Sequence, residues 1–263
     1  MSISSNTLFH FVRQPQYLVD ILNKDFYPRY CKENFGFKFI HFKEAYILMK
    51  CFCDIPLSQI SNHTKFYGSY GVGFSKEWGI RNHINPIIYL GKDSNTYKVL
   101  NSTTRKRLDD STKLYTKGEI TEEEHYHNVF ETLSIIAYVK PIRGRMPRGK
   151  TYFNNVNFYN EREWRYVPLE FINHKGENQE NRVFLLPTDL ENLDENIQRL
   201  HDISKRDMQL TFEANDIKYI FIKDESERSF FCNLILNSNY FLEEEKKVMV
   251  SKILTIKQIN EDF

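Results

Sequence analysis

Residues 51–78 read CFCDIPLSQISNHTKFYGSYGVGFSKEW, and this stretch organises the interpretation of the whole chain. Within it, residues 67–74 alternate large side chains with glycine or serine. A core strand ordinarily uses valine and isoleucine, whereas glycine weakens a strand. Repeated glycine therefore indicates a strand whose backbone another group approaches closely. We interpret residues 67–74 as a strand at a ligand site, with an aromatic patch between ordinary strands as the alternative.

Working outward from this stretch, strands and helices alternate without regular βαβ units. An apolar strand, LFHFV, spans residues 8–12, and apolar residues at helical spacing predict a helix over 14–23. Further strands are expected at 37–41, 46–53, 86–90, 157–169 and 217–222, and further helices at 57–67 and 190–200. A turn region is expected at 78–85. This order predicts an α+β fold, and no linker divides residues 1–263 into two domains.

Composition excludes several classes of protein. The chain has 263 residues, 41% of them hydrophobic, so a core can form without disulfides or structural metals. The net charge of +1 directs the chain to no particular partner. The absence of a signal peptide and of a long apolar run predicts a cytoplasmic protein with reduced thiols and no membrane contact.

Residues 91–130 are polar and predict a helical insertion, with a capping box at Thr121 and Glu124.

Two segments carry candidate site residues. In NEREWRYVP, residues 160–168, a strand would place Glu161, Glu163 and Arg165 on one face. Buried charges of this kind need partners, so the alternatives are a salt-bridge ladder and a functional carboxylate. A bulge would reverse the face, so the choice between the two glutamates stays open. His10 lies in an apolar strand, where it is either a satisfied core residue or a ligand-binding residue.

The sequence gives weaker signals for a metal site, for a thiol nucleophile and for nucleic-acid binding. His125 and His127 are two residues apart on a predicted helix and point away from each other, so no metal site is expected. Cys51 or Cys53 could act as a nucleophile with His63, or both thiols could be buried and inert. The loop at 141–150 contributes basic residues that could contact nucleic acid, namely Arg143, Arg145, Arg148 and Lys150.

Several segments together resemble the AbiGi family of bacterial abortive-infection proteins. They are LFHFV, FYPRYC, CFCDIPLS, a His four residues before YGSYGVGFSKEW, INPIIYL, EREWRY and LTFEANDIKYIFIKDESE. The family is labelled an antitoxin of a two-gene phage-resistance system. The resemblance therefore implies a role in defence against phage and a cognate toxin or antitoxin protein as partner.

A second, weaker resemblance is to the DarT-like ADP-ribosyltransferases, which have a split mixed or antiparallel β core with NAD in the cleft. It implies that His10 binds the nicotinamide ribose, that Tyr67 or Tyr70 stacks on the nicotinamide, and that Ser69 lies beside the cofactor. Glu163, or else Glu161, would stabilise the oxocarbenium-like charge as nicotinamide leaves. Arg165 would pair with a phosphate or neutralise the glutamate. The acceptor, a nucleic acid or a protein, would be guided by Arg143, Arg145, Arg148 and Lys150.

The chain departs from the transferase pattern in two ways. Its tyrosine spacing does not reproduce the standard signature, and its glutamates lie in a charge-dense stretch. Three functions are therefore considered from the sequence. The first is an NAD-dependent toxin or effector in phage defence, and the second is a non-catalytic antitoxin or sensor that binds a partner protein. The third is a nucleic-acid-binding regulator that uses the basic loop from Arg143 to Lys150.

Overall fold

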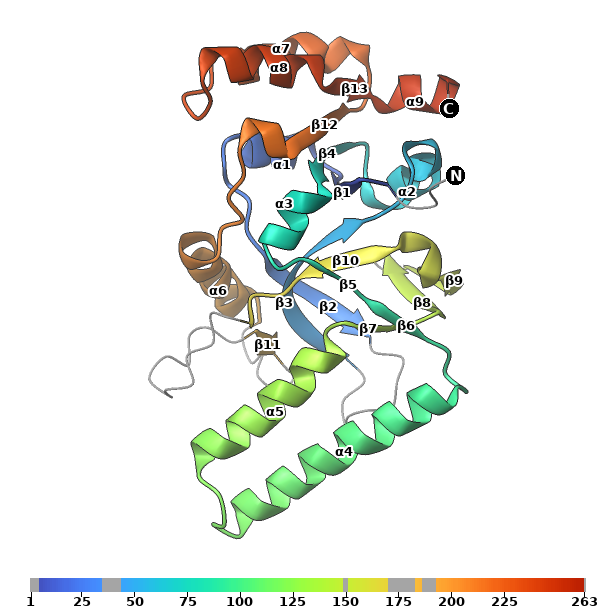
Figure 1. The fold of residues 1–263 in the computed structure, drawn as a ribbon, viewed down its shortest axis with the longest axis vertical. Helices are drawn as coiled ribbons and strands as arrows, with labels where there is room; N and C mark the ends of the chain where they lie inside the picture. Colours follow the sequence, from blue (N-terminus) through green and yellow to red (C-terminus); the bar gives the residue numbers. More distant parts are fainter. Residues whose placement is uncertain (1–4, 35–43, 149–150, 170–182, 186–192, 263) are drawn as a thin grey trace.

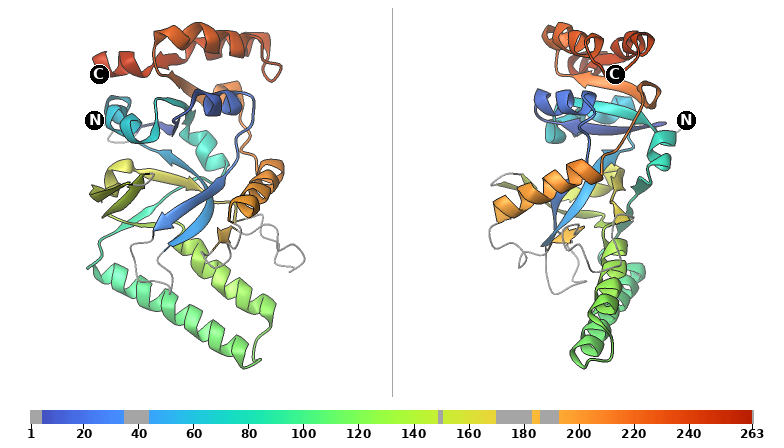
Figure 2. Two further views of the ribbon diagram at one scale, coloured as in Figure 1. Left: turned by 180° about the vertical axis from the view of Figure 1, so that it is seen from behind. Right: turned by 90° about the vertical axis from the view of Figure 1, so that its left-hand side faces the viewer.

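The computed structural model describes residues 5–34, 44–148, 151–169, 183–185 and 193–262. These residues form an α+β fold around one mixed sheet, which confirms the predicted class. Figures 1 and 2 show the sheet in the middle of an elongated molecule, with helices α7 (Arg228–Leu236), α8 (Glu243–Ser251) and α9 (Ile256–Asp262) at one end. A pair of long helices extends from the other end. Among the described helices, none has the length and apolar character needed to cross a membrane.

The sheet runs in the order β13-β12-β4-β1-β3-β10-β5, and β2 and β11 pair with another part of β3. Every pairing in it is antiparallel except that between β12 and β13. The strands are β1 (Thr7–Val12), β2 (Arg29–Asn34), β3 (Glu44–Cys53), β4 (Tyr70–Ser75), β5 (Asn85–Pro86), β10 (Glu163–Tyr166), β11 (Phe184–Leu185), β12 (Ile217–Ile222) and β13 (Ile253–Thr255).

The sheet is nearly divided between β1 and β3. Strands β1 and β4 pair along their whole length, from Thr7–Ser75 to Val12–Tyr70. Strands β1 and β3, in contrast, share a single registered pair, Phe9–Cys53. Away from this pair β3 follows β2 instead, so the two halves of the sheet diverge.

The glycines of β4 serve the protein's own packing, which corrects the expectation that a ligand approaches them. Gly71 lies opposite Phe11 and Gly73 opposite Phe9 on β1. A β-carbon at Gly73 would stand 3.0 Å from ring carbons of Phe9, and one at Gly71 would stand 2.5 Å from the His10 carbonyl oxygen. The aromatic rings of β1 therefore occupy the space above the glycines.

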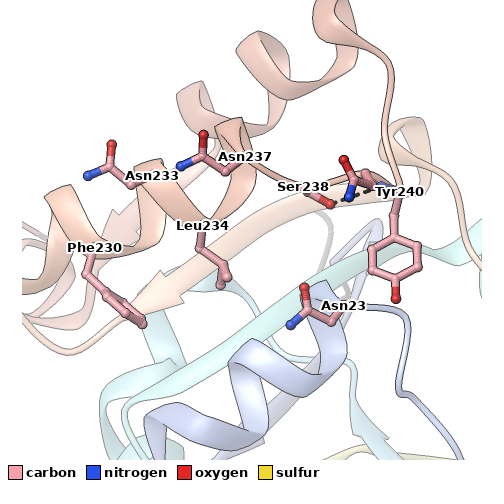
Figure 3. A pocket seen from close by; sticks show the side chains of 8 residues that line it. Asn23, Phe230, Asn233, Leu234, Asn237, Ser238 and Tyr240 are labelled. Carbon is pink, nitrogen blue, oxygen red and sulfur yellow. Dashed lines mark hydrogen bonds between the residues drawn. The ribbon is translucent and has the colours of Figure 1, made fainter.

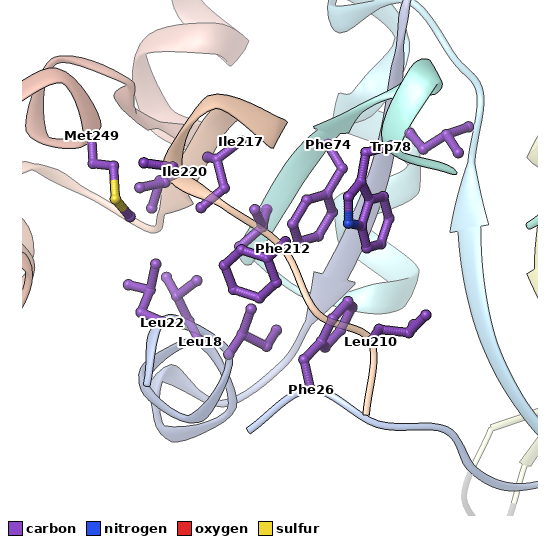
Figure 4. Packing of buried hydrophobic residues seen from close by; sticks show 14 of the residues in the cluster. Leu18, Leu22, Phe26, Phe74, Trp78, Leu210, Phe212, Ile217, Ile220 and Met249 are labelled. Carbon is purple, nitrogen blue, oxygen red and sulfur yellow. The ribbon is translucent and has the colours of Figure 1, made fainter. Parts of the chain in front are cut away.

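Buried apolar side chains among the described residues form three clusters, two of which lie on opposite faces of the sheet. Figure 4 shows the larger of these two, in which Phe26 and the stacked pair Phe74 and Trp78 pack among aliphatic side chains. The helices around it include α1 (Pro15–Leu22) and α3 (Lys76–Arg81), the latter lying where a turn region was expected. The smaller cluster, on the opposite face, includes Phe9, Phe11 and Phe221. Burial of these large side chains is the main stabilising contribution to the fold.

Two long helices occupy much of the polar stretch, α4 (Asn95–Thr116) and α5 (Glu122–Ile136). They form a helical hairpin that extends from the sheet in both views of Figure 2. The predicted capping box at Thr121 and Glu124 is present at the start of α5. The remaining described helices are α2 (Ile60–Tyr67) and α6 (Leu193–Asp207), and a 3-10 turn, η1 (Leu57–Gln59), precedes α2. Two further 3-10 turns, η5 (Ala214–Asp216) and η6 (Glu225–Glu227), flank β12.

Two local expectations differ from the structure, and a third falls in a part of the chain that the structure does not describe. The loop expected at 141–150 is largely a strand, β8 (Arg143–Arg148), which forms a hairpin with β9 (Thr151–Asn157). A separate small pairing joins β6 (Ile88–Leu90) to β7 (Val139–Pro141). The long strand expected at 157–169 is shortened by a 3-10 turn, η2 (Phe158–Glu161). The strand expected at 37–41 lies outside the described residues.

Candidate functional site

A cavity of about 510 Å³ lies at the division between β1 and β3. This volume is within the range of small-molecule sites. Its wall is built from β1, α1, β2, β3, α2, β7 and the segment joining η2 to β10. The cavity brings together seven residues predicted from sequence. Four belong to the predicted NAD site, namely His10, Tyr67, Glu161 and Glu163, and three to the predicted thiol chemistry, namely Cys51, Cys53 and His63.

His10 bridges the division in the sheet. Its Nδ1 lies 2.8 Å from the Cys51 carbonyl oxygen on β3. Because a carbonyl only accepts, Nδ1 carries the proton and Nε2 is left with a lone pair. Burial, and then the charge of Lys50, lower the pKa of His10 to about 3, so the imidazole is neutral. His10 therefore acts as a hydrogen-bond acceptor toward anything in the cavity.

Glu163 is held by two cations. Its Oε1 accepts from Arg165 Nε at 2.6 Å, and its Oε2 accepts from Lys140 Nζ at 2.9 Å. Burial alone would raise the pKa of Glu163, but the charges of Arg165 and Lys140 outweigh burial and keep this pKa well below its ordinary value. The carboxylate is consequently ionised, and each of its oxygens accepts a hydrogen bond from a cationic side chain.

Glu161 is held in a similar way. Tyr67 donates its hydroxyl to Glu161 Oε1 at 2.6 Å, and Lys140 donates to Oε2 at 2.9 Å. Burial, together with the Glu161 charge, raises the pKa of Tyr67, so the phenol keeps its proton. One face of the Tyr67 ring is covered by His63, at 4.4 Å between ring centres.

The backbone explains why both glutamates reach one lysine. Glu161 ends the 3-10 turn η2, and Glu163 begins β10. Arg162, between them, has the left-handed values φ 43° and ψ 51°. Glu163 and Arg165 share a strand face as predicted, because they contact each other directly. Glu161 reaches the same side from the turn and not from the strand.

Sequence reasoning missed the shared cation. Lys140 comes from β7, more than twenty residues before its two glutamates, so the local spacing of residues does not predict that it pairs with them. A second lysine, Lys50 on β3, also lines the cavity. Tyr89 on β6 supports the site by accepting the Glu163 backbone N–H at 2.9 Å.

Other predicted residues lie away from the cavity. Tyr70 belongs to the larger apolar cluster and donates to Glu227 Oε1 at 2.5 Å, and Ser69 does not line the cavity. Arg165 lies behind the cavity wall with 1% of its side chain exposed, donating to the Ala137 carbonyl at 2.6 Å. Its other nitrogen, Nη2, stands 3.3 Å from Glu33 Oε2.

Of the predicted basic residues, Arg143 and Arg145 lie on β8, outside the lining of the cavity. Arg143 and Arg145 are exposed there, and the Arg145 guanidinium stacks 3.7 Å from the ring centre of Tyr152. Arg148 ends the strand, and Lys150 lies outside the described residues.

Thiol and metal chemistry receive little support. Burial raises the pKa of both Cys51 and Cys53 well above the ordinary value, as expected for inert thiols. His125 contacts Ser111 while His127 contacts Glu131, so the two imidazoles point apart as predicted. Within the described ranges, no cluster of His, Cys, Asp and Glu could hold a metal ion.

A second hollow of about 540 Å³ lies along α7 (Figure 3). Its lining is mostly amide and aromatic, with Asn23, Asn233, Asn237, Phe230 and Tyr240 among its members. It contains no carboxylate, lysine or histidine that could exchange a proton near neutral pH. The cavity at the division of the sheet is therefore the better candidate for a small-molecule site.

Comparison with known proteins gives a consistent result. A family model described as abortive phage resistance protein AbiGi, antitoxin, matches residues 24–223. The chain is also 30% identical over 259 residues to the abortive phage resistance protein AbiGi of Lactococcus lactis subsp. cremoris, covering 90% of this chain and 99% of that protein. No solved structure matches the chain.

Proposed function

This chain belongs to the AbiGi family of abortive phage resistance proteins, and from that premise we propose that it is an antitoxin that binds and restrains a protein toxin. The description of the family supports this role. On this proposal, the chain recognises a partner surface and turns over no substrate.

The observation that carries the proposal is the pairing of the two glutamates. Each oxygen of Glu161 and Glu163 already accepts a hydrogen bond from the protein at 2.9 Å or less. A carboxylate that stabilises a developing positive charge must face the reacting atoms. Here, Lys140 and Arg165 neutralise the carboxylates instead, as in a buried ion-pair network that holds the site rigid.

The helical hairpin of α4 and α5 supplies a surface for the partner. Large apolar side chains are exposed on both helices, including Val99 at 63% and Tyr126 at 56%. An interface is marked by exposed apolar side chains that form one patch, and on this proposal the exposed apolar residues of the two helices contribute to such a patch. We therefore place toxin binding on this hairpin.

Co-expression with the product of the neighbouring gene tests the proposal. The full chain should co-purify with that product, and the variants Val99→Glu and Tyr126→Glu should weaken the complex by placing charge in an apolar interface. Glu119→Lys, near the tip of the hairpin and exposed, provides a control for charge change alone. A complex that never forms, or one insensitive to both apolar substitutions, would contradict this assignment.

The cavity favours a second candidate function, an ADP-ribosyltransferase-like effector that uses NAD. It is the shared lining by His10, Tyr67, Glu161 and Glu163 that favours it. The neutral His10 Nε2 would accept from a ribose hydroxyl, and Glu163 would stabilise the charge on the ribose after release from Lys140 or Arg165. The nicotinamide would stack on the open face of Tyr67, and a nucleic-acid acceptor would lie near Arg143 and Arg145.

This candidate is tested with labelled NAD, bacterial RNA, sheared DNA and cell lysate. Glu161→Gln and Glu163→Gln each remove one charge while keeping the shape of the side chain. Label transfer or nicotinamide release that is lost in one variant would support the transferase and identify its carboxylate. Absence of turnover by folded protein would leave the antitoxin role.

A further inference from the structure

We propose that the cavity binds a small phosphorylated molecule that also carries hydroxyl groups, with its anionic group held by Lys50 and by Arg29. Sugar phosphates and nucleotides belong to this class. The inference concerns binding at one end of the cavity, and it requires neither nicotinamide nor turnover. It goes beyond the antitoxin role and holds whether or not a toxin binds the helical hairpin.

The first observation is the state of Lys50. Its ammonium lines the cavity, 4.7 Å above the ring centre of Phe26. Within the described part of the chain, it makes no hydrogen bond and no ion pair. Lys50 is half-buried, and an ammonium drawn partly out of water without an ion-pair partner is costly, so such a group is rarely kept for stability alone. Burial lowers the pKa of Lys50 to about 8, which leaves most of it charged at neutral pH.

The second observation is the distribution of charge around the cavity. The acids at the other end are already neutralised, because Lys140 binds Glu161 and Glu163 while Arg165 binds Glu163 and contacts Glu33. Arg29, in contrast, hydrogen-bonds only the Tyr27 hydroxyl among described residues and stacks on aromatic rings. Asp25, the lining carboxylate that acts on Lys50, is itself paired with Lys205 at 2.6 Å. Lys50 and Arg29 therefore leave an excess of positive charge at the end formed by β2 and β3, where an anion would be attracted.

The third observation concerns acceptors that lack donors. Asp25 Oδ1 is buried without a hydrogen-bond partner, although Oδ2 accepts from Lys205 at 2.6 Å. His10 Nε2 is also an acceptor, since Nδ1 is committed to Cys51. Both residues line the same cavity as Lys50. A ligand that brings hydroxyl donors as well as an anion would satisfy all of these groups together.

Calorimetry on the full chain tests the proposal, with ribose 5-phosphate as the probe and ribose as its uncharged match. We expect one ribose 5-phosphate to bind per chain and ribose to bind far more weakly. Lys50→Met keeps the length of the side chain and removes the charge, so affinity should fall by at least about tenfold. Lys65→Met, at an exposed position of α2, should leave affinity unchanged.

Thermal unfolding of the free variants separates ligand binding from a structural role. A ligand-binding Lys50 predicts that Lys50→Met is as stable as the wild type or more stable, because an unpaired buried charge has been removed. A melting temperature that falls, with affinity for ribose 5-phosphate unchanged, would overturn the proposal. So would a wild-type protein that binds neither ribose 5-phosphate nor inorganic phosphate. These measurements do not involve a toxin, so the proposal of ligand binding and the proposal of toxin binding can each fail without the other.

Discussion

Replacing Lys140 with methionine should be among the most damaging single changes at this site. The ammonium donates to Glu161 and Glu163 at 2.9 Å each, and all three side chains are at most 12% exposed. Removing it leaves Glu163 with Arg165 alone and Glu161 with Tyr67 alone. Loss of one member of a buried ion pair costs about 3–5 kcal/mol. We expect Lys140→Met to lower the free energy of unfolding by that amount at pH 7.

Urea unfolding followed by the fluorescence of the buried Trp78 measures this loss. Lys117→Met is the matched control, because Lys117 also pairs with a glutamate, at 3.7 Å, but both side chains are more than half exposed. Its cost should stay below about 1 kcal/mol. Adding Glu161→Gln to Lys140→Met should recover part of the stability, because the orphaned charge disappears.

Two results would refute this reasoning. One is a cost for Lys140→Met no larger than that of the exposed control. The other is additivity: the double variant would lose the cost of Lys140→Met plus the full cost of Glu161→Gln measured alone. Additive costs would mean that the two residues do not interact.

Further predictions follow from the same structure. Gly71→Ala should destabilise the protein by about 2 kcal/mol because its β-carbon meets a backbone oxygen, whereas Gly91→Ala, with its nearest neighbour at 3.9 Å, should be nearly neutral in the same urea assay. The pKa of His10 is about 3 when folded and 6.5 ordinarily, so its stabilising contribution is complete above pH 6.5 and is lost as the pH falls toward 3; His10→Asn should flatten this part of the stability curve. Burial likewise lowers the pKa of Lys50, from 10.5 to about 8, so its effect has the same sign as that of His10: stability should rise between pH 8 and 10.5 relative to Lys50→Met, and a flat difference curve would contradict a lowered pKa of Lys50.

The sequence singled out several residues that do line the cavity, but it gave the wrong reason for the glycines of residues 67–74. His10 and the EREWR segment carry polar groups in apolar surroundings, a pattern visible without any structure. Residues 67–74 drew attention for their glycines, yet those glycines pack under Phe9 and Phe11. The residue from that stretch that reaches the cavity is Tyr67, which ends a helix before the strand begins.

What could not be predicted depends on tertiary pairing. The cation at the centre of the ion-pair network, Lys140, is a single lysine in a short strand far along the chain from its partners. The left-handed backbone of Arg162 shortens the expected strand and has no glycine or asparagine to signal it. Lys50 sits between apolar residues of β3, and only the divergence of β1 from β3 shows that it faces a cavity.

The two glycines of β4 also constrain how relatives of this protein can diverge. At Gly73 the obstacles to a larger residue are the side chains of Thr7 and Phe9, which can themselves be exchanged for smaller ones. At Gly71 the nearest obstacle is the main chain of His10, which no substitution removes. Homologous sequences should therefore show position 73 varying in concert with positions 7 and 9, while position 71 stays glycine whatever its neighbours become.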